Sequence, residues 1–143
     1  MIRLGHDFRA FSQAFQRLSR DIRGAAELIV RKTAERAEGL LRERAPRRTG
    51  RMAEDVGSTI YGRMAIVGFR THYARFLEFG MRPHEIRPRR AGALRFSMDG
   101  RIVFARRVLH PGIRPRYLVR AVAEELRRQL SSIFEEVIEH VIG

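Results

Sequence analysis

The sequence predicts an α+β fold, in which a small antiparallel sheet of two hairpins carries a long N-terminal helix and a long C-terminal helix packed on it. Three observations predict this fold. Apolar residues recur at spacings of three and four at both ends of the chain, β-prone runs fill the middle, and an Asp-Gly pair divides two of these runs. The chain has 143 residues and 44% hydrophobic content, so we expect a single domain over residues 1–143 with a folded core.

The first helix is expected over residues 7–44. Its apolar stripe comprises Phe8, Phe11, Phe15, Leu18, Ile22, Ala25 and Ile29, and continues to Leu40 and Leu41. A helix of this length spans roughly 55 Å, which exceeds what a compact domain of this size covers with its own core. We therefore expect that part of the stripe contacts another surface, or that the helix breaks at Gly24 or Gly39. Pro46 ends the helix because proline disfavours helical geometry at the preceding residue.

The first half of the middle region is expected to form a loop, a hairpin and a short helix. The predicted loop covers residues 45–55, and the hairpin comprises the β-prone runs 56–61 and 64–70 around Gly62. Residues 73–79 predict one or two helical turns closed by Gly80, since glycine tolerates the backbone conformation that ends helices.

The second half of the middle region contains a second hairpin between two loops. Two prolines and four arginines make residues 82–92 a loop. The pair Asp99-Gly100 separates the β-prone runs 94–98 and 101–105, and its two residues tolerate the positive φ of a two-residue turn. Phe96 and Phe104 alternate with polar or basic neighbours, as core residues would, and residues 106–114 are expected to be extended or loop.

The C-terminal helix is expected to begin at Pro115, since proline is favoured at the first helical position. Its apolar stripe runs to the C-terminus through Val119, Val122, Leu126, Leu130, Ile133, Val137 and Val141.

The net charge of +13 comes from one lysine and 28 arginines against 16 acidic residues. Arginine makes planar, bidentate contacts with carboxylates and phosphates, so the composition favours a nucleic-acid partner or a large assembly interface; a merely solvated basic surface is the alternative. Residues 82–120 carry eleven arginines against two acids, whereas residues 121–143 carry five glutamates against two arginines. A basic middle and an acidic tail attract each other, within one chain or between copies.

Several classes of site are excluded by the sequence. It has no cysteine, no helical pair of histidines, no G-x-S-x-G motif and no phosphate-binding glycine loop. We therefore expect no catalytic residue, metal or cofactor. Glu78, in an apolar context, is either a helix-end carboxylate paired with arginine or the general base of a small hydrolase or toxin-like enzyme. No apolar run is long enough to cross a membrane and no secretory signal is present, so we expect a soluble protein made in the cytoplasm.

A nucleic-acid-binding module without sequence readout is the main alternative to an assembly protein. Its basic set comprises Arg87, Arg89, Arg90, Arg95, Arg101, Arg106 and Arg107. No helix-turn-helix, zinc finger or RNA-reading motif accompanies these arginines, and no exposed aromatic platform is expected.

Four short motifs, in order, resemble the tail-component family of long-tailed bacteriophages. Residues 45–52 (APRRTGRM) are similar to that family's A-P-x-x-T-G-x-L, and residues 73–80 (YARFLEFG) to its Y-A-x-x-x-E-F-G-T. His110-Pro111-Gly112 resembles its H-P-G, and residues 116–121 resemble the P-F-L-x-x-A that opens its last helix. Met81 and Tyr117 depart from the threonine and phenylalanine that are usual there. The resemblance covers roughly residues 8–130.

The resemblance implies a structural virion protein without enzymatic activity, assembled in the bacterial host cytoplasm. It implies a closed ring of six-fold or twelve-fold symmetry at the head–tail junction or the upper end of the tail, contacting neck and tail-tube proteins. Genomic DNA would pass through the lumen without being read, and no membrane is involved. The candidate interface, for which internal packing of the aromatic stretch is the alternative, comprises Tyr73, Phe76, Glu78, Phe79, Arg87, Arg89, Arg90, Glu135, Glu136 and Glu139.

Overall fold

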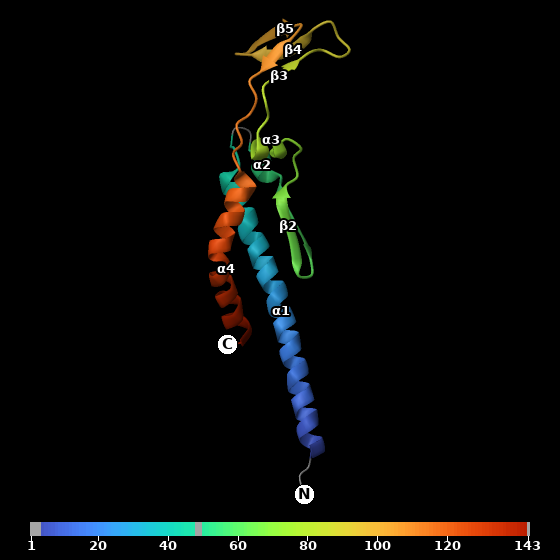
Figure 1. Ribbon diagram of the computed structural model, residues 1–143, viewed down its shortest axis with the longest axis vertical. Helices are drawn as coiled ribbons and strands as arrows, with labels where there is room; N and C mark the ends of the chain where they lie inside the picture. Colours follow the sequence, from blue (N-terminus) through green and yellow to red (C-terminus); the bar gives the residue numbers. More distant parts are fainter. Residues whose placement is uncertain (1–3, 48–49, 143) are drawn as a thin grey trace. The chain divides into compact units, whose positions relative to one another are not determined.

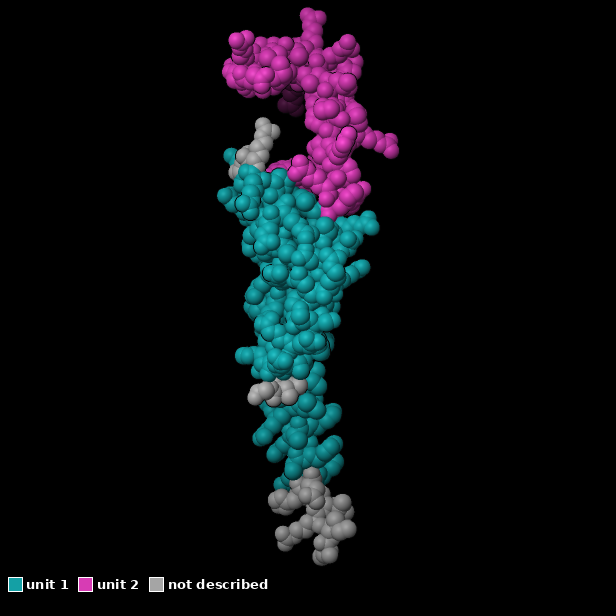
Figure 2. Space-filling view, turned by 90° about the vertical axis from the view of Figure 1, so that its left-hand side faces the viewer, with its two compact units in different colours: residues 1–71, 118–143 teal, residues 72–117 magenta. Residues whose placement is uncertain are grey.

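The computed structural model describes residues 4–47 and 50–142, with only the backbone described at 4–7 and at 142. Its internal packing divides the chain into two compact units, shown in Figure 2. Unit 1 comprises residues 1–71 and 118–143, and unit 2 comprises residues 72–117. The α+β class predicted from the sequence is confirmed. The two units are described one at a time below.

Unit 1 is built on one uninterrupted helix, α1 (Leu4–Arg44). The helix runs through Gly24 and Gly39 without a break, so the structure resolves the two predicted possibilities in favour of continuity. Its C-terminal half is held by burial of Ala34, Ala37, Leu40 and Leu41. It ends two residues before Pro46, as the sequence predicts, and the Ala45 amide donates to the Leu41 carbonyl at 2.9 Å.

The C-terminal helix α4 (Leu118–Ile142) lies antiparallel beside α1 (Figure 1). Val122, Ile133 and Val137 of the predicted stripe are buried, and Val137 has no exposed surface. Polar contacts run along the pair in antiparallel order: Arg44 with Glu125, Arg36 with Gln129, and Lys32 with Glu136. The apolar stripe and these polar contacts together set the register of the two helices.

A hairpin of β1 (Val56–Tyr61) and β2 (Met64–Phe69) packs on α1. Val56 pairs with Phe69 and Tyr61 with Met64, and Gly62 takes a φ of 56° in the connecting turn. Val56 is buried with Leu41 and Val122, and Val67 and Phe69 pack against this cluster. The hairpin thereby completes the core of unit 1.

The segment that joins α1 to the hairpin contains a short helix that the sequence prediction missed. We predicted a loop over residues 45–55, whereas α2 spans Arg51–Glu54. This single turn places Met52, which is 2% exposed, in the core. Arg48 and Thr49 of the A-P-R-R-T-G motif lie outside the described residues.

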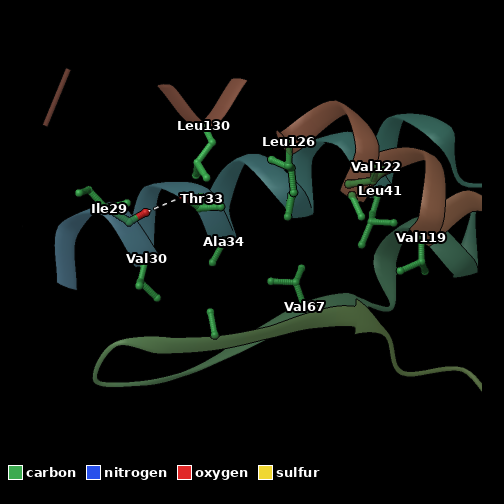
Figure 3. A pocket seen from close by; sticks show the side chains of 13 residues that line it. Ile29, Val30, Thr33, Ala34, Leu41, Val67, Val119, Val122, Leu126 and Leu130 are labelled. Carbon is green, nitrogen blue, oxygen red and sulfur yellow. Dashed lines mark hydrogen bonds between the residues drawn. The ribbon is translucent and has the colours of Figure 1, made fainter. Parts of the chain in front are cut away.

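An apolar groove of about 410 Å³ lies between α1, α4 and β2 in unit 1 (Figure 3). Its walls carry small and branched side chains, among them Thr33, Ala34, Val67, Val122 and Leu126. The Thr33 hydroxyl donates to the Ile29 carbonyl at 2.7 Å, so its polar atom is satisfied inside α1. Apart from Thr33, the residues that line the groove are apolar and carry no ionisable or nucleophilic side chain.

Unit 2 contains a short helix and four strands. These are α3 (Ala74–Phe79), β3 (His84–Ile86), β4 (Leu94–Met98), β5 (Arg101–Ala105) and β6 (Val108–His110). β4 pairs with β5 across Asp99-Gly100, whose φ values of 51° and 77° confirm the predicted turn. β3 pairs with β6, His84 opposite His110.

The strands differ from the prediction in two ways. Residues 82–92 were expected to be loop, but a three-residue strand fits between Pro83 and Pro88 because β3 needs only backbone bonds to β6. The sequence also predicts one sheet of two hairpins, whereas the described strands form three separate two-stranded sheets. The first hairpin packs on α1 within unit 1, whereas the hairpin of β4 and β5 belongs to unit 2. The strands of the two hairpins form no hydrogen-bonded pairs with each other.

The start of the last helix was predicted three residues too early. We expected Pro115 as its first residue, but α4 begins at Leu118 because Tyr117 has a φ of 49°, which no right-handed helix accommodates. Residues 116 and 117 instead bond to the end of α3, as described next.

Candidate assembly interface

The end of α3 is closed by a segment that follows almost forty residues later. The Arg116 amide donates to the Leu77 carbonyl at 2.6 Å, and the Tyr117 amide to the Glu78 carbonyl at 3.4 Å. Carbonyls in the last turn of a helix lack partners within it, so these two bonds satisfy groups that the six-residue helix leaves open.

Two glycines bring the chain back against α3. Gly80 ends the short helix as predicted, but its φ of 76° and ψ of 177° are an extended conformation rather than the left-handed helical cap that we expected. A Cβ there would lie 2.8 Å from the Ile113 carbonyl oxygen. Gly112 has a φ of 84°, and a Cβ there would overlap the Met81 carbonyl oxygen. Between them, Met81 and Ile113 exchange two backbone hydrogen bonds of 2.8 Å. The motifs E-F-G and H-P-G and residues 116–117 thus meet at one place in unit 2.

The histidines of β3 and β6 belong to this arrangement. The rings of His84 and His110 stack with centroids 5.1 Å apart. The Gly112 amide lies 3.0 Å from His110 Nδ1, which accepts its hydrogen bond. Within the part of the chain that the structure describes, no group of three or more histidine, cysteine or acidic side chains could hold a metal ion. The hydrogen bond from Gly112 to His110 closes the H-P-G turn.

The aromatic residues of the candidate interface divide into exposed and half-buried members. Phe79 is 77% exposed and Tyr73 is 44% exposed, whereas Phe76 and Glu78 are half-buried. The Phe76 ring is covered by the Arg75 guanidinium, whose carbon lies 4.7 Å from the ring centroid. Phe79 and Tyr73 thus offer apolar surface to a partner, while Phe76 contributes chiefly to the packing of unit 2.

The candidate arginines lie on exposed chain between β3 and β4. Arg87 donates to both carboxylate oxygens of Glu85, at 2.9 and 3.3 Å, and this partner raises the pKa of Arg87. Arg89 and Arg90 are exposed. Arg87 is therefore engaged within the chain, and Arg89 and Arg90 present their charge to solvent.

The three candidate glutamates of α4 do not share one environment. Glu136 forms an ion pair with Lys32 of α1 inside the same chain. Glu135 and Glu139 are exposed. Attraction between the acidic tail and basic groups is thus already used within the molecule at Glu136, and Glu135 and Glu139 remain the candidates for contacts between copies.

A further apolar surface, outside the predicted site, lies at the start of α1. We call it the N-terminal seam, and it comprises Phe8, Phe11, Phe15, Leu18 and Ile22, each between 55% and 71% exposed. The sequence predicts surplus apolar surface on this helix, but the predicted candidate interface does not contain these residues. The signal for these residues in the sequence is their spacing of three and four, because this apolar stripe is longer than the C-terminal helix that packs against it.

The predicted core position of Phe104 is wrong; we expected both Phe96 and Phe104 to be core residues. In the structure Phe104 is 66% exposed. Phe96 pairs with Val103, and Arg95 pairs with Phe104, so the two rings lie on opposite faces of the hairpin. The Asp-Gly turn fixes this register, because Met98 and Arg101 flank it directly.

Comparison with known proteins identifies the family. Residues 9–80 match the family model HK97-gp10-like, described as "Bacteriophage HK97-gp10, putative tail-component". No curated protein and no solved structure matches the chain. None of the described helices is both long and apolar enough to traverse a bilayer. The matched residues include most of α1, the first hairpin and the Y-A-R-F-L-E-F-G motif, and the family is one of structural proteins of the virion. The chain belongs to the HK97-gp10-like family of bacteriophage tail components.

Proposed function

We propose that copies of this protein form a closed ring at the head–tail junction or at the upper end of the phage tail, with six-fold or twelve-fold symmetry. The observation that carries the proposal is the exposed apolar surface: a tail component of 143 residues leaves Phe79, Leu109 and the whole N-terminal seam uncovered. Apolar surface of this extent marks an interaction site in a folded protein. Head-to-tail contacts between identical copies close into rings.

Three surfaces have distinct roles in this proposal. The N-terminal seam and the exposed rings of Tyr73 and Phe79 supply apolar contact area to neighbouring subunits. Arg89 and Arg90 meet acidic groups such as Glu135 and Glu139 of the next copy, or of the adjoining neck and tail-tube proteins. Genomic DNA passes through the lumen without being read, and the ring assembles in the host cytoplasm.

Electron microscopy tests this function directly. Purified protein at physiological salt should form rings of uniform size, and labelled copies should lie at the neck or the top of the tail in whole virions. Particles that remain single in solution and are absent from the virion would contradict the proposal. Normal virions containing this protein at another part of the tail would contradict the location alone.

A second candidate function, binding of nucleic acid without sequence readout, is favoured by one observation. The exposed ring of Phe104 lies opposite Arg95 in the second hairpin, and exposed aromatic rings among arginines stack on unpaired bases. Titration of the protein against random duplex and single-stranded DNA at several salt concentrations separates the two functions. Sub-micromolar affinity with a steep log–log fall would favour nucleic acid, and weak binding with ring formation would favour assembly.

A substitution at Glu78 distinguishes these two functions from that of an enzyme. Its side chain is half-buried on α3, and the family to which the chain belongs is structural. If the carboxylate has no catalytic part, Glu78→Gln should leave any hydrolytic activity of the purified protein unchanged. Loss of a hydrolytic activity with unchanged assembly would reverse this conclusion.

A further inference from the structure

A hollow of about 800 Å³ lies in unit 2 where two segments of the chain cross. Residues 79–83 form one wall and residues 111–115 the other, and the backbone bonds between Met81 and Ile113 hold the walls together. Three prolines stiffen these walls, since the proline ring fixes the backbone φ. We call this site the crossing hollow, and its walls are held in place without a partner.

The crossing hollow is positively charged. Arg82 and Arg114 line it, both are exposed, and no acidic residue belongs to either wall. Within the described residues, no ion pair joins either arginine to an acidic side chain. The surrounding unit adds to this charge, because residues 72–117 contain eleven arginines and three acidic residues. Guanidinium groups bind carboxylates and phosphates, so the partner of this site carries one of these groups.

The surface between the two arginines is apolar. It comprises the prolines, Met81, Ile113 and the ring of Phe79, which is 77% exposed. A phosphate backbone would neutralise the arginines but would leave this surface against polar groups. A protein surface that carries both carboxylates and an apolar side chain matches the charge and the apolar area together. The composition of the crossing hollow therefore favours an acidic protein surface over a nucleic acid.

The second half of α4 offers such a surface. Residues 129–142 contain three glutamates and neither arginine nor lysine. Glu135 and Glu139 lie one helical turn apart, both are exposed, and neither forms an ion pair within the described residues. The ring of Phe134, next to Glu135 in the chain, is 52% exposed. We call these three residues the acidic face of α4.

The length of the connecting chain shows that this partner is a second copy. Pro115, the last residue of the wall, precedes α4 by three residues, and three extended residues span at most about 11 Å. At 1.5 Å per residue, Glu135 and Glu139 lie roughly 26 and 32 Å from the first residue of α4. So short a connection cannot bring both glutamates to the crossing hollow of their own chain.

We propose that the crossing hollow binds the acidic face of α4 from a second copy. The two arginines of the hollow pair with Glu135 and Glu139, and Phe134 packs against the apolar walls. The inference rests on the proposed ring and identifies one of its contacts. Two different surfaces meet in this contact, which is therefore heterologous, as head-to-tail assembly requires.

Reversal of charge on both surfaces tests the contact. Arg82→Glu with Arg114→Glu, or Glu135→Lys with Glu139→Lys, should weaken self-association about tenfold or more, measured by analytical ultracentrifugation. The chain that carries all four changes restores opposite charges, so its association should return to within about threefold of the natural protein. Weak association of this fourfold variant, with its helix content by circular dichroism unchanged, would overturn the proposal.

The matched control uses Arg89 and Arg90, which are exposed in unit 2 but do not line the crossing hollow. Arg89→Glu with Arg90→Glu, combined with the same two lysine substitutions, has the net charge of the natural chain, as the fourfold variant has. It should nevertheless fail to recover association. Equal recovery in both variants would place the contact on the connection between β3 and β4 and would exclude the hollow.

Chemical cross-linking tests the same contact without reversing any charge, since the natural chain has no cysteine. A mixture of the Arg114→Cys and Glu139→Cys proteins, treated with a short bismaleimide, should give a cross-linked dimer that contains one copy of each. A mixture of Arg89→Cys with Glu139→Cys is the control and should give little product. Equal yields from the two mixtures would contradict the proposal, and this result decides if the charge variants fail to fold.

Two further outcomes identify the alternatives. If Arg82→Glu with Arg114→Glu weakens binding of random duplex DNA and leaves self-association unchanged, the hollow is a phosphate site and the proposal is wrong. Normal rings from this variant in electron micrographs would retain the ring and exclude the hollow as one of its contacts. Charge rescue and specific cross-linking in open chains without rings would support the hollow and exclude the closed ring.

Discussion

Gly112 has the tightest surroundings of any glycine described. Its backbone lies so close to the Met81–Arg82–Pro83 segment that any side chain would overlap the Met81 carbonyl oxygen and crowd the Pro83 nitrogen. Its φ of 84° adds strain for every residue that carries a Cβ. The last position of the H-P-G motif therefore requires glycine for two reasons: there is no room for a Cβ, and the backbone has a positive φ.

Gly112→Ala should destabilise the Met81–Ile113 bridge by about 1–3 kcal/mol, since both strain and overlap oppose the native geometry. Hydrogen exchange at the Met81 and Ile113 amides, which donate the two bridge bonds, measures the loss. Gly92→Ala is the matched control, because a Cβ there meets nothing within 4 Å. Equal protection in the two variants would contradict the close approach at Gly112.

Single residues also show what the sequence could predict. The positive φ values at Asp99 and Gly100 follow from their identity and position between β-prone runs. The outward ring of Phe104 follows from the same turn by counting the register, a step that the sequence prediction omitted. The left-handed backbone of Tyr117 has no local signal in the sequence, and it accompanies a hydrogen bond to Glu78, thirty-nine residues earlier.

At the scale of elements, α1 keeps two glycines in its interior and still forms one helix. Both Gly24 and Gly39 would meet nothing within 4 Å if they carried a Cβ, so they fill no packing role that a larger residue would disturb. Their cost is the conformational freedom lost on folding. The free energy gained by burying the apolar face of α1 exceeds this cost. Local helix propensity does not include that burial, so the sequence alone leaves open whether the helix is continuous.

Gly39→Ala should therefore stabilise unit 1 by about 0.5–1 kcal/mol. Urea unfolding measures the change in the free energy of unfolding. Gly62→Ala, where φ is 56° in the first hairpin, should shift stability in the opposite direction. A loss of stability in the Gly39 variant would show that the residue has a contact role in α1.

Glu38 links α1 to the first hairpin and makes the stability of that contact depend on pH. A hydrogen bond from the Ser58 side chain, and next the neighbouring Arg42, lower the pKa of Glu38 below its ordinary value of 4.5, while burial opposes them. A carboxylate whose pKa is lower in the folded state contributes stability above pH 4.5, and this contribution is lost as the pH falls through the folded value.

Ser58→Ala should reduce this pH dependence, since it removes the largest cause of the lowered pKa. Thermal unfolding followed from about pH 6 to about pH 3 should show a smaller decline for the variant than for the natural chain. Thr59→Ala, at the exposed neighbouring position, is the control and should retain the natural profile. Identical profiles for all three proteins would exclude Ser58 as the source.

At the scale of the whole molecule, charge is distributed between internal and external contacts. The pairs Arg44–Glu125 and Lys32–Glu136 hold the helices of unit 1 together, so part of the acidic tail serves the single chain. From the sequence alone, all three late glutamates were candidates for contacts between copies. Only the antiparallel register of α1 and α4 shows that Glu136 differs from its two neighbours.

Reversing Glu135 and Glu139 to lysine should weaken assembly and leave the fold unchanged, because both side chains are exposed. Glu136→Lys should instead cost stability, about 0.2–1 kcal/mol for a partly exposed pair, by placing two like charges together on α1 and α4. Light scattering at low and high salt measures assembly, and urea unfolding measures stability. Rings that form equally well from the double variant at low salt would remove these glutamates from the interface.

The pairing of Lys32 with Glu136, 104 positions apart, also determines when the protein can mature during synthesis. A ribosome adds about 5–20 residues each second, so the first helix waits roughly 5–20 s for the last one to emerge. Throughout that interval the buried face of the first helix lacks its permanent cover. Nascent chains on neighbouring ribosomes of one messenger RNA can therefore associate through exposed apolar surface before their synthesis is complete. A molecular chaperone, or rapid release from the ribosome, would then raise the yield of correctly assembled tails.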